Sequence, residues 1–249
     1  MMYPSWYGAW IAIGICVVMT CLRKDRLFVQ RMTSDQTFDL AFYVLLAAIV
    51  GGRLLFIIDY WRVFESWGAV FNLTVPGFSV LGSVVAAIAT LFWYLKKYTL
   101  DFYGVVDRIA LYAPLLHACG RIGCFCVGCC HGISCDYPWS VVYAKASSLA
   151  PIGAALHPTQ LYSAACFLLL FCILFFIDRS DHWRIIPGFL ITVYVFGLGL
   201  ERFFIDFLRD DRILVSWVQA LSTSQICALL CMFYALVHAV YLFERQNDG

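Results

Sequence analysis

Apolar residues run along the chain in seven long stretches, separated by short polar segments. A helix needs about 20 apolar residues to cross the roughly 30 Å hydrocarbon core of a bilayer. The stretches approach this length, and they occupy residues 5–22, 38–58, 77–95, 103–120, 158–178, 185–204 and 222–243. Strand-like alternation is absent, and backbone groups in lipid must bond within their own segment. We therefore predict an all-α polytopic membrane protein with about seven transmembrane helices. Residues 1–249 should form a single integral membrane domain.

Two details qualify this pattern. Asp107 and Arg108 interrupt the start of the fourth stretch, which makes it the weakest of the seven. The first apolar run, from Tyr7 to Leu22, follows an uncharged start and lacks a small-residue cleavage site. It is therefore expected to be a retained span rather than a removable signal peptide.

Composition agrees with a membrane location. Hydrophobic residues make up 63% of the chain and charged residues 13%, against about 25% charged residues in a soluble domain. The net charge of +1 argues against a nucleic-acid partner.

Basic residues in the loops predict the orientation, because cytoplasmic loops carry an excess of Lys and Arg. Nine basic residues fall on one side: Arg23, Lys24, Arg26, Arg31, Lys96, Lys97, Arg179, Arg184 and Arg245. Six fall on the other: Arg62, Arg121, Lys145, Arg202, Arg209 and Arg212. We expect the N-terminus outside and the C-terminus in the cytoplasm. The cysteine-rich segment 120–132 then lies at the outer face, where thiols can be oxidised.

Three arginines lie within or at the ends of apolar stretches: Arg53, Arg121 and Arg202. A charge at membrane depth costs several kcal/mol unless it is paired or hydrated, so such residues are functional candidates. A guanidinium binds phosphate through two parallel hydrogen bonds, and the abundant phosphate in a bilayer belongs to lipid. The alternatives are snorkelling to the interface and an ion-pair network, with Glu201 and Asp206 as partners for Arg202.

Further polar groups stand at the boundaries of the stretches. His157, Gln160 and Tyr162 combine a titratable ring, an amide and a phenol at the start of the fifth stretch. In a helical turn, His157 and Gln160 would share a face, although an interfacial histidine bonded to a carbonyl is also plausible. Tyr7 fits an aromatic belt equally well. Glycines on both sides of Arg121 allow the chain to bend around a lipid head group.

The order of these motifs resembles the prolipoprotein diacylglyceryl transferase family. The matching segments are WYG (6–8), GGRLLFIIDY (51–60), GFSVLGS (77–83), DRIALYAP (107–114), GRIGCF (120–125), HPTQLY (157–162), GLERFFIDFLRDD (199–211) and LSTSQI (221–226). The resemblance implies a multi-pass enzyme of the bacterial cytoplasmic (inner) membrane. Such an enzyme moves diacylglycerol from phosphatidylglycerol, or a related phospholipid, to the thiol of a lipobox cysteine in a lipoprotein precursor. A thioether forms and glycerol phosphate leaves.

The resemblance also implies roles for individual residues. Arg121 and Arg202 match the family's essential arginines and are expected to hold the phosphate, with His157 or His131 assisting proton removal. The expected substrate-binding residues are Tyr7, Arg53, Gln160, Tyr162, Asp206, Arg209 and Gly132. No cofactor or metal is expected.

The chain departs from the family pattern at three positions. Leu81 stands where the family usually has a histidine that is a proposed base, Cys124 replaces an asparagine, and Cys129 replaces an acidic residue. Two alternatives follow: a divergent paralogue that uses another acceptor, and a non-catalytic membrane protein that binds lipid or metal.

Six of the twelve cysteines gather within residues 119–135. They allow three interpretations. One is simple packing with a disulfide at the outer face. Another is chemistry, with Cys124, Cys129 or His131 replacing the lost groups. The third is a zinc site built from Cys124, Cys126, Cys129, Cys130 and His131. The other six cysteines are expected to be small apolar fillers in helices.

Overall fold

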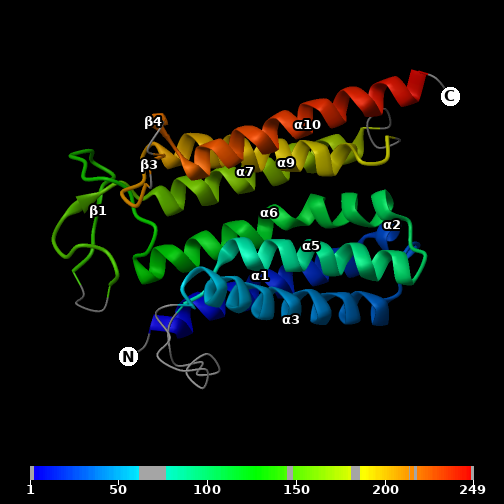
Figure 1. The fold of residues 1–249 in the computed structure, drawn as a ribbon, viewed down its shortest axis with the longest axis horizontal. Coiled ribbons are helices and arrows are strands. Elements are labelled where there is room, and N and C mark those ends of the chain that lie inside the picture. The colour runs from blue at the N-terminus through cyan, green and yellow to red at the C-terminus, as the bar shows by residue number, and fades with distance from the viewer. Residues whose placement is uncertain are drawn as a thin grey trace. The chain divides into compact units, whose positions relative to one another are not determined.

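The computed structural model describes residues 3–61, 77–144, 148–180, 186–212, 214–215 and 218–247. The long helices are α1 (Tyr3–Lys24), α3 (Ser34–Asp59), α5 (Val80–Lys97), α6 (Phe102–Val127), α7 (Thr159–Arg179), α9 (Phe189–Asp206) and α10 (Thr223–Asn247). A short helix, α2, spans Arg26–Val29. Four short strands complete the described elements (Figure 1): β1 (Val141–Val142), β2 (Ala155–Leu156), β3 (Leu214–Val215) and β4 (Val218–Ser222).

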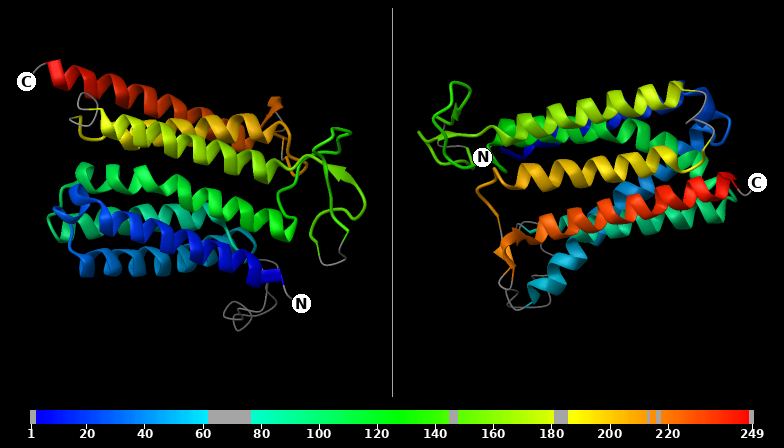
Figure 2. Two further views of the ribbon diagram at one scale, coloured as in Figure 1. Left: turned by 180° about the vertical axis from the view of Figure 1, so that it is seen from behind. Right: turned by 90° about the horizontal axis from the view of Figure 1, so that it is seen from above.

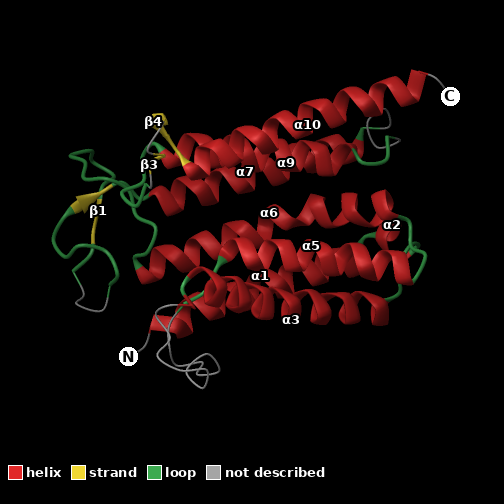
Figure 3. Cartoon of the chain, viewed as in Figure 1, coloured by secondary structure: helices red, strands yellow, loops and turns green. Residues whose placement is uncertain are grey.

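A helix occupies each of the seven predicted stretches, which confirms the all-α, polytopic prediction (Figure 3). Among the described residues, six helices are long and apolar enough to cross a membrane: α1, α3, α5, α6, α7 and α10. The seventh, α9, carries Glu201, Arg202 and Asp206 near its C-terminal end. Three basic residues used to predict orientation, Arg62, Lys145 and Arg184, lie outside the described residues.

The chain divides into two compact units, and the prediction of a single domain stays a prediction. The first unit comprises Met1–Asp25 and Val106–Gly249. In it, α10 packs along α9 and α9 packs along α7 (Figure 2). Buried apolar side chains of α6, α7 and α9 form its core: Leu111, Ala118, Phe167, Leu170, Leu174 and Leu190.

The polar start of α6 is buried because both of its charges are satisfied. Asp107 accepts hydrogen bonds from the backbone N–H groups of Gly188, at 2.7 Å, and Ile191, at 2.9 Å. It thereby caps the N-terminus of α9, whose first amides have no partner within their own helix. Arg108 forms ion pairs with Asp25, at 3.4 Å, and with Asp178. These contacts explain how a helix with an interrupted apolar pattern still forms.

The second unit comprises Arg26–Val105, and in it α3 packs against α5. The two helices approach most closely at glycines, because a Cβ atom on Gly51 would lie 2.7 Å from the carbonyl oxygen of Gly82. Small residues permit such approach between membrane helices. Arg53 belongs to this unit, where its Nη1 donates to the carbonyl of Gly77 at 3.0 Å. Leu81 is 66% exposed on α5.

Candidate active site

The C-terminal ends of α6 and α9 and the start of α7 lie at the same end of the first unit (Figure 1). Hydrogen bonds connect the loop segments next to these helix ends. The backbone N–H of Gly132 donates to the carbonyl of His157 at 3.0 Å. The backbone N–H of His157 donates to the carbonyl of Ile133, also at 3.0 Å. Ile133 donates in turn to the carbonyl of Leu208 at 2.9 Å. Main-chain bonds therefore hold together the loop that follows α6, the start of the HPTQLY segment and the residues that follow α9.

Arg121, in the last two turns of α6, faces a buried carboxylate. Its Nη2 lies 3.9 Å from Oε1 of Glu201, whose side chain is 5% exposed, while the Arg121 side chain keeps 21% of its surface exposed. Ser163 on α7 donates a short hydrogen bond to the same carboxylate oxygen. The ion-pair alternative offered Glu201 as a partner for Arg202, but consecutive helix positions point about 100° apart. Among the ion pairs of the described residues, Glu201 pairs with Arg121 instead.

Arg202 pairs with Asp206 one turn later, which is the other partner that the ion-pair alternative offered. The Arg202 Nη2 lies 3.2 Å from Oδ1 of Asp206 and donates to Oγ of Ser224 at 2.7 Å. The Asp206 side chain is only 2% exposed, and its other oxygen accepts a short hydrogen bond from Ser222. Asp206 therefore positions Arg202, whose side chain remains 31% exposed.

Arg209 forms the only bidentate arginine–carboxylate pair among the hydrogen bonds of the described residues. Its Nε and Nη2 donate to the two carboxylate oxygens of Asp211 at 2.7 and 2.6 Å. These bonds lower the pKa of the Asp211 carboxyl. Burial alone would lower the pKa of Arg209, but its bonds to Asp211 and Cys130 outweigh burial and raise it. Asp211 is the exposed partner, at 58%, whereas the Arg209 side chain is 8% exposed.

The arginine cluster, which we define as Arg121, Arg202 and Arg209, acts as one electrostatic unit. The positive charges of Arg209 and Arg121 both reach the guanidinium of Arg202. Arg212 adds a fourth positive charge, 3.7 Å from Asp206. These four guanidinium groups face the three carboxylates of Glu201, Asp206 and Asp211, so one positive charge is left uncompensated within the group.

The three HPTQLY side chains have separate roles, contrary to the prediction of a shared helix face. Helix α7 begins at Thr159, so His157 precedes it and is not in its first turn. The His157 ring contacts Tyr162, with Nδ1 3.3 Å from the hydroxyl oxygen. Gln160, at 1% exposure, instead donates to the carbonyl of Cys129 at 2.8 Å. Thr159 donates to the carbonyl of Cys130 at 2.8 Å.

Two further predicted site residues are Tyr7, in α1, and His131, in the loop that follows α6. Tyr7 packs on α6 at Gly123, where a Cβ atom would lie 3.2 Å from Cδ2 of Tyr7. Tyr7 also lies within electrostatic reach of Arg121 and of the thiols of the loop. His131 is turned toward its own chain, with Nδ1 3.1 Å from the carbonyl oxygen of Gly132.

Three cysteines converge beside the arginine cluster. The Sγ atoms of Cys124, Cys129 and Cys130 all lie within 4.8 Å of one another. Cys126 and His131, which the zinc interpretation included, do not join this group in the described part of the chain. None of the twelve cysteines, all of which are described, is in a disulfide, so the predicted outer disulfide is not formed in this structure.

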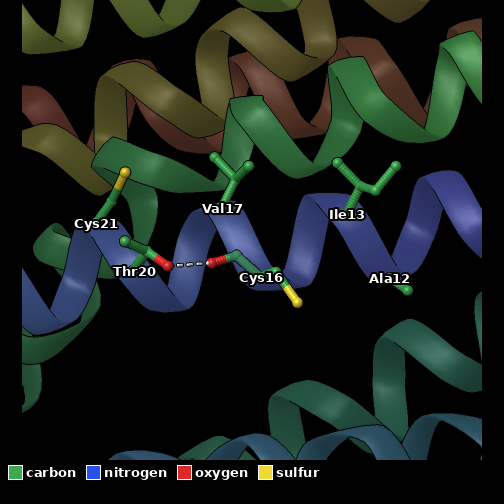
Figure 4. A pocket seen from close by; sticks show the side chains of 6 residues that line it. All are labelled: Ala12, Ile13, Cys16, Val17, Thr20 and Cys21. Carbon is green, nitrogen blue, oxygen red and sulfur yellow. Dashed lines mark hydrogen bonds between the residues drawn. The ribbon is translucent and has the colours of Figure 1, made fainter.

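A separate hollow lies along one side of α1 and is lined by Ala12, Ile13, Cys16, Val17, Thr20 and Cys21 (Figure 4). The Thr20 hydroxyl donates to the carbonyl of Cys16 at 2.7 Å, which leaves an apolar lining. Such a surface suits an acyl chain and lacks the charge that the chemistry of a phosphate group requires.

A family model described as prolipoprotein diacylglyceryl transferase matches residues 3–241. The chain belongs to the prolipoprotein diacylglyceryl transferase family. It is 31% identical to a phosphatidylglycerol–prolipoprotein diacylglyceryl transferase of Clostridium tetani, over 96% of this chain and 91% of that protein. It is 28% identical to the transferase 2 of Clostridium perfringens, over 96% and 89%. It is also 28% identical to the transferase of Vibrio cholerae El Tor Inaba N16961, over 96% and 88%.

Membership of the transferase family agrees with the motifs, but several residues that build the site were not singled out from the sequence. Ser163, Ser222 and Ser224 orient the carboxylates and Arg202, and Gln225 bonds Arg212 at 3.1 Å. Three of these four belong to the LSTSQI segment, whose resemblance to the family motif was the available signal. Asp211 ends the GLERFFIDFLRDD segment in the same way.

Gly132 is required where this transferase brings its loop segments together. A Cβ atom there would lie 2.6 Å from Cβ of His157 and 2.7 Å from the carbonyl oxygen of Leu208. Neither atom can rotate away, so we expect Gly132→Ala to lower the free energy of unfolding by about 1–3 kcal/mol. Chemical unfolding in detergent measures this change.

The matched control is Gly8→Ala on α1, where a Cβ atom would meet nothing within 4 Å. Alanine is the better helix former, so this variant should be as stable as the wild type or slightly more stable. Equal stability of the two variants would mean that the loop segments are not packed as described.

Proposed function

We propose that this chain transfers a diacylglyceryl group from phosphatidylglycerol, or a related anionic phospholipid, to a cysteine thiol of a lipoprotein precursor. The observation that carries the proposal is the arginine cluster, in which buried carboxylates orient Arg121 and Arg202 and the exposed carboxylate of Asp211 pairs with Arg209. The relatives' names supply the donor and acceptor. The reaction takes place at the outer face of the bacterial cytoplasmic membrane, with the N-terminus outside and the C-terminus inside.

The arginine cluster holds the lipid phosphate. Arg121 and Arg202 are each fixed by one carboxylate and keep 21% and 31% of their side chains exposed. The Arg209 fork already binds an anion of the right shape, the exposed carboxylate of Asp211. A phosphate offers the same pair of acceptor oxygens, so it can displace Asp211 from Arg209.

The chemistry is a substitution at carbon. The acceptor sulfur, as thiolate, forms a bond to the terminal glyceryl carbon of the diacylglyceryl group. The bond from that carbon to the phosphate oxygen breaks, and glycerol phosphate leaves with the electron pair. The arginine cluster stabilises the charge that develops on the leaving oxygen. The thiol proton, from a group whose pKa is near 8.5 when unperturbed, passes to His157 or His131.

The other predicted residues have supporting roles in this proposal. Tyr7 and Tyr162 border the site, and Gly132 allows its loop segments to meet. Asp206 and Gln160 act as positioning residues, because their side chains are buried and bonded to Arg202 and to the Cys129 carbonyl. Arg53, whose Nη1 donates to the carbonyl of Gly77, stays a predicted lipid-binding residue.

The test supplies purified protein with phosphatidylglycerol and a lipobox peptide. We expect a thioether product whose mass exceeds that of the peptide by one diacylglyceryl group, and no product from the peptide with serine in place of cysteine. Complementation of a host that lacks its own transferase checks the same activity in cells. Absence of product beside an active relative overturns the proposal for this acceptor.

A second candidate, transfer to a different acceptor, is favoured by Leu81, Cys124 and Cys129 at positions where the family usually has other groups. Comparing the lipids and lipidated products of cells with and without this protein by mass spectrometry separates the two. The second candidate is supported if cells without the protein release less glycerol phosphate but still make the lipoprotein thioether.

A further inference from the structure

The cysteine cluster, which we define as Cys124, Cys129 and Cys130, has no assigned role in the family chemistry. Its three Sγ atoms lie within 4.8 Å of one another, and none is in a disulfide. Cys124 is buried and the other two are partly buried, so the cluster is largely protected from solvent but remains accessible. Such an arrangement is more specific than the packing of small apolar side chains.

The surrounding chain fixes the cluster. Cys124 lies in the last turn of α6, and Gly128 and Cys130 adopt positive φ values of 80° and 60° that turn the chain back. Gln160 and Thr159 at the start of α7 bond the carbonyls of Cys129 and Cys130, each at 2.8 Å. The thiols are therefore placed by two helix ends rather than by a free loop.

Two arginines of the arginine cluster lie beside these thiols. The Arg209 guanidinium lies within hydrogen-bonding reach of Cys130, and the charge of Arg121 acts on Cys124. Positive charge next to a thiol favours its thiolate form. Negative charge on a metal-bound cysteine cluster can therefore be balanced by the arginine cluster.

The spacing suits one soft metal ion. With zinc–sulfur bonds of about 2.3 Å in tetrahedral geometry, sulfur atoms lie about 3.8 Å apart. Sulfurs already within 4.8 Å reach that separation by small side-chain rotations. Three thiolates around a divalent ion carry a net charge of −1, which a neighbouring guanidinium neutralises.

We propose that Cys124, Cys129 and Cys130 bind one thiophilic divalent cation of the zinc type and leave its fourth position to an external thiol. A zinc site with three protein ligands and one exchangeable position is typical of catalysis, whereas structural sites use four. The exchangeable thiol is the acceptor cysteine, and this part rests on the proposed function.

The reaction balances without a further reagent. The acceptor thiol displaces water from the metal, binds as thiolate and releases its proton to His157 or His131. Its sulfur then forms the new carbon–sulfur bond while the carbon–oxygen bond to phosphate breaks. The thioether formed is a neutral, weaker ligand, so water replaces it. Activation of the thiol at the cysteine cluster would substitute for the histidine that Leu81 replaces.

Metal content tests the site independently of activity. Wild-type protein purified from zinc-containing medium should carry about one zinc per chain, measured by elemental mass spectrometry. Cys124→Ser, Cys129→Ser and Cys130→Ser should each lower zinc affinity by about 100-fold or more, since loss of even an outer-shell partner costs 10- to 100-fold. The matched control, Cys126→Ser, changes an exposed thiol outside the cluster and should retain zinc.

A measurement on the wild type alone guards against misfolded variants. Cobalt added to metal-free protein should give a thiolate-to-metal charge-transfer band of the intensity expected for three sulfur ligands. Absence of that band while all three thiols are titrated as reduced overturns the site. Zinc in the wild type no higher than in Cys130→Ser, or a disulfide within the cluster, overturns it as well.

The fourth position is tested with the cobalt form. A lipobox peptide with cysteine should raise the charge-transfer intensity by one further thiolate, and the serine peptide should not. No change with the cysteine peptide overturns this part of the inference. Bound metal without thioether product would defeat the proposed function alone, whereas full product from metal-free protein would defeat the role of the metal alone.

Discussion

Replacing Arg121 with alanine lowers the rate of thioether formation by about 100- to 1,000-fold, the cost of removing one preorganised group from a developing negative charge. Arg121 pairs with Glu201 and keeps 21% of its side chain exposed. In the proposed function its exposed hydrogen-bond donors bind the lipid phosphate. Arg121→Lys keeps the charge but loses the planar fork, and its loss should be smaller. Initial rates with phosphatidylglycerol and a lipobox peptide measure both.

Two controls separate catalysis from folding. Arg245→Ala removes an exposed basic residue from the last turn of α10 and should leave the rate unchanged. Unfolding in detergent shows how much stability Arg121→Ala loses by leaving Glu201 without its cation. A rate within threefold of the wild type, with a folded variant, would remove Arg121 from the phosphate site.

Replacing Arg108 with methionine lowers the free energy of unfolding by about 3–5 kcal/mol, because it leaves two buried carboxylates without their cation. The side chains of Arg108 and Asp25 are each 6% exposed and that of Asp178 is 17% exposed. Tyr112 also donates to Asp25 at 3.0 Å, and this bond alone cannot neutralise the charge. Chemical unfolding in detergent, followed by tryptophan fluorescence, measures the loss.

The matched control is Asp101→Asn, which breaks the exposed pair between Arg31 and Asp101. These side chains are 34% and 57% exposed, and an exposed pair contributes about 0–1 kcal/mol. An Arg108→Met protein that unfolds at the same denaturant concentration as Asp101→Asn would show that the Arg108 ion pairs are not buried as described.

Most of the fold could be predicted from the sequence, because bilayer thickness sets the length of an apolar helix. Each predicted stretch contains a helix, and most helices extend a few residues beyond the stretch into the polar boundary. The weakest prediction was the start of α6. Its charges are satisfied by Asp25, Asp178 and the first turn of α9, all 70 or more residues away along the chain, and no local pattern reveals such partners.

The site could be predicted as a set of residues but not as a set of contacts. The motif positions singled out Arg121 and Arg202, and in the structure each of them faces a buried carboxylate. The ion pair between Arg121 and Glu201 could not be predicted from the sequence, because the two residues belong to different helices. The position of Gln160 relative to His157 differed because α7 begins at Thr159, two residues after His157.

The cysteines illustrate a different limit. Spacing along the chain included Cys126 and His131 with the other thiols. In the structure a positive φ at Cys130, together with two hydrogen bonds from side chains of α7 to loop carbonyls, brings only three thiols together. Loop conformation of this kind depends on neighbours that are distant in sequence. The motif marked the segment as chemically unusual, and the structure identified which thiols meet.

Asp107 and Arg108 share one end of α6, and Arg121 and Cys124 share the other, about 20 Å away at 1.5 Å per residue. The first pair fastens α6 to α9, to α7 and to the end of α1. The contacts that hold these helices together are thus far from the end of α6 that carries Arg121 and Cys124. Because the stabilising contacts and the reactive groups lie at opposite ends of α6, residues at the Arg121 end can be substituted without lowering the stability of the helix bundle. The cysteines at positions where the family usually has an amide and an acid are such substitutions.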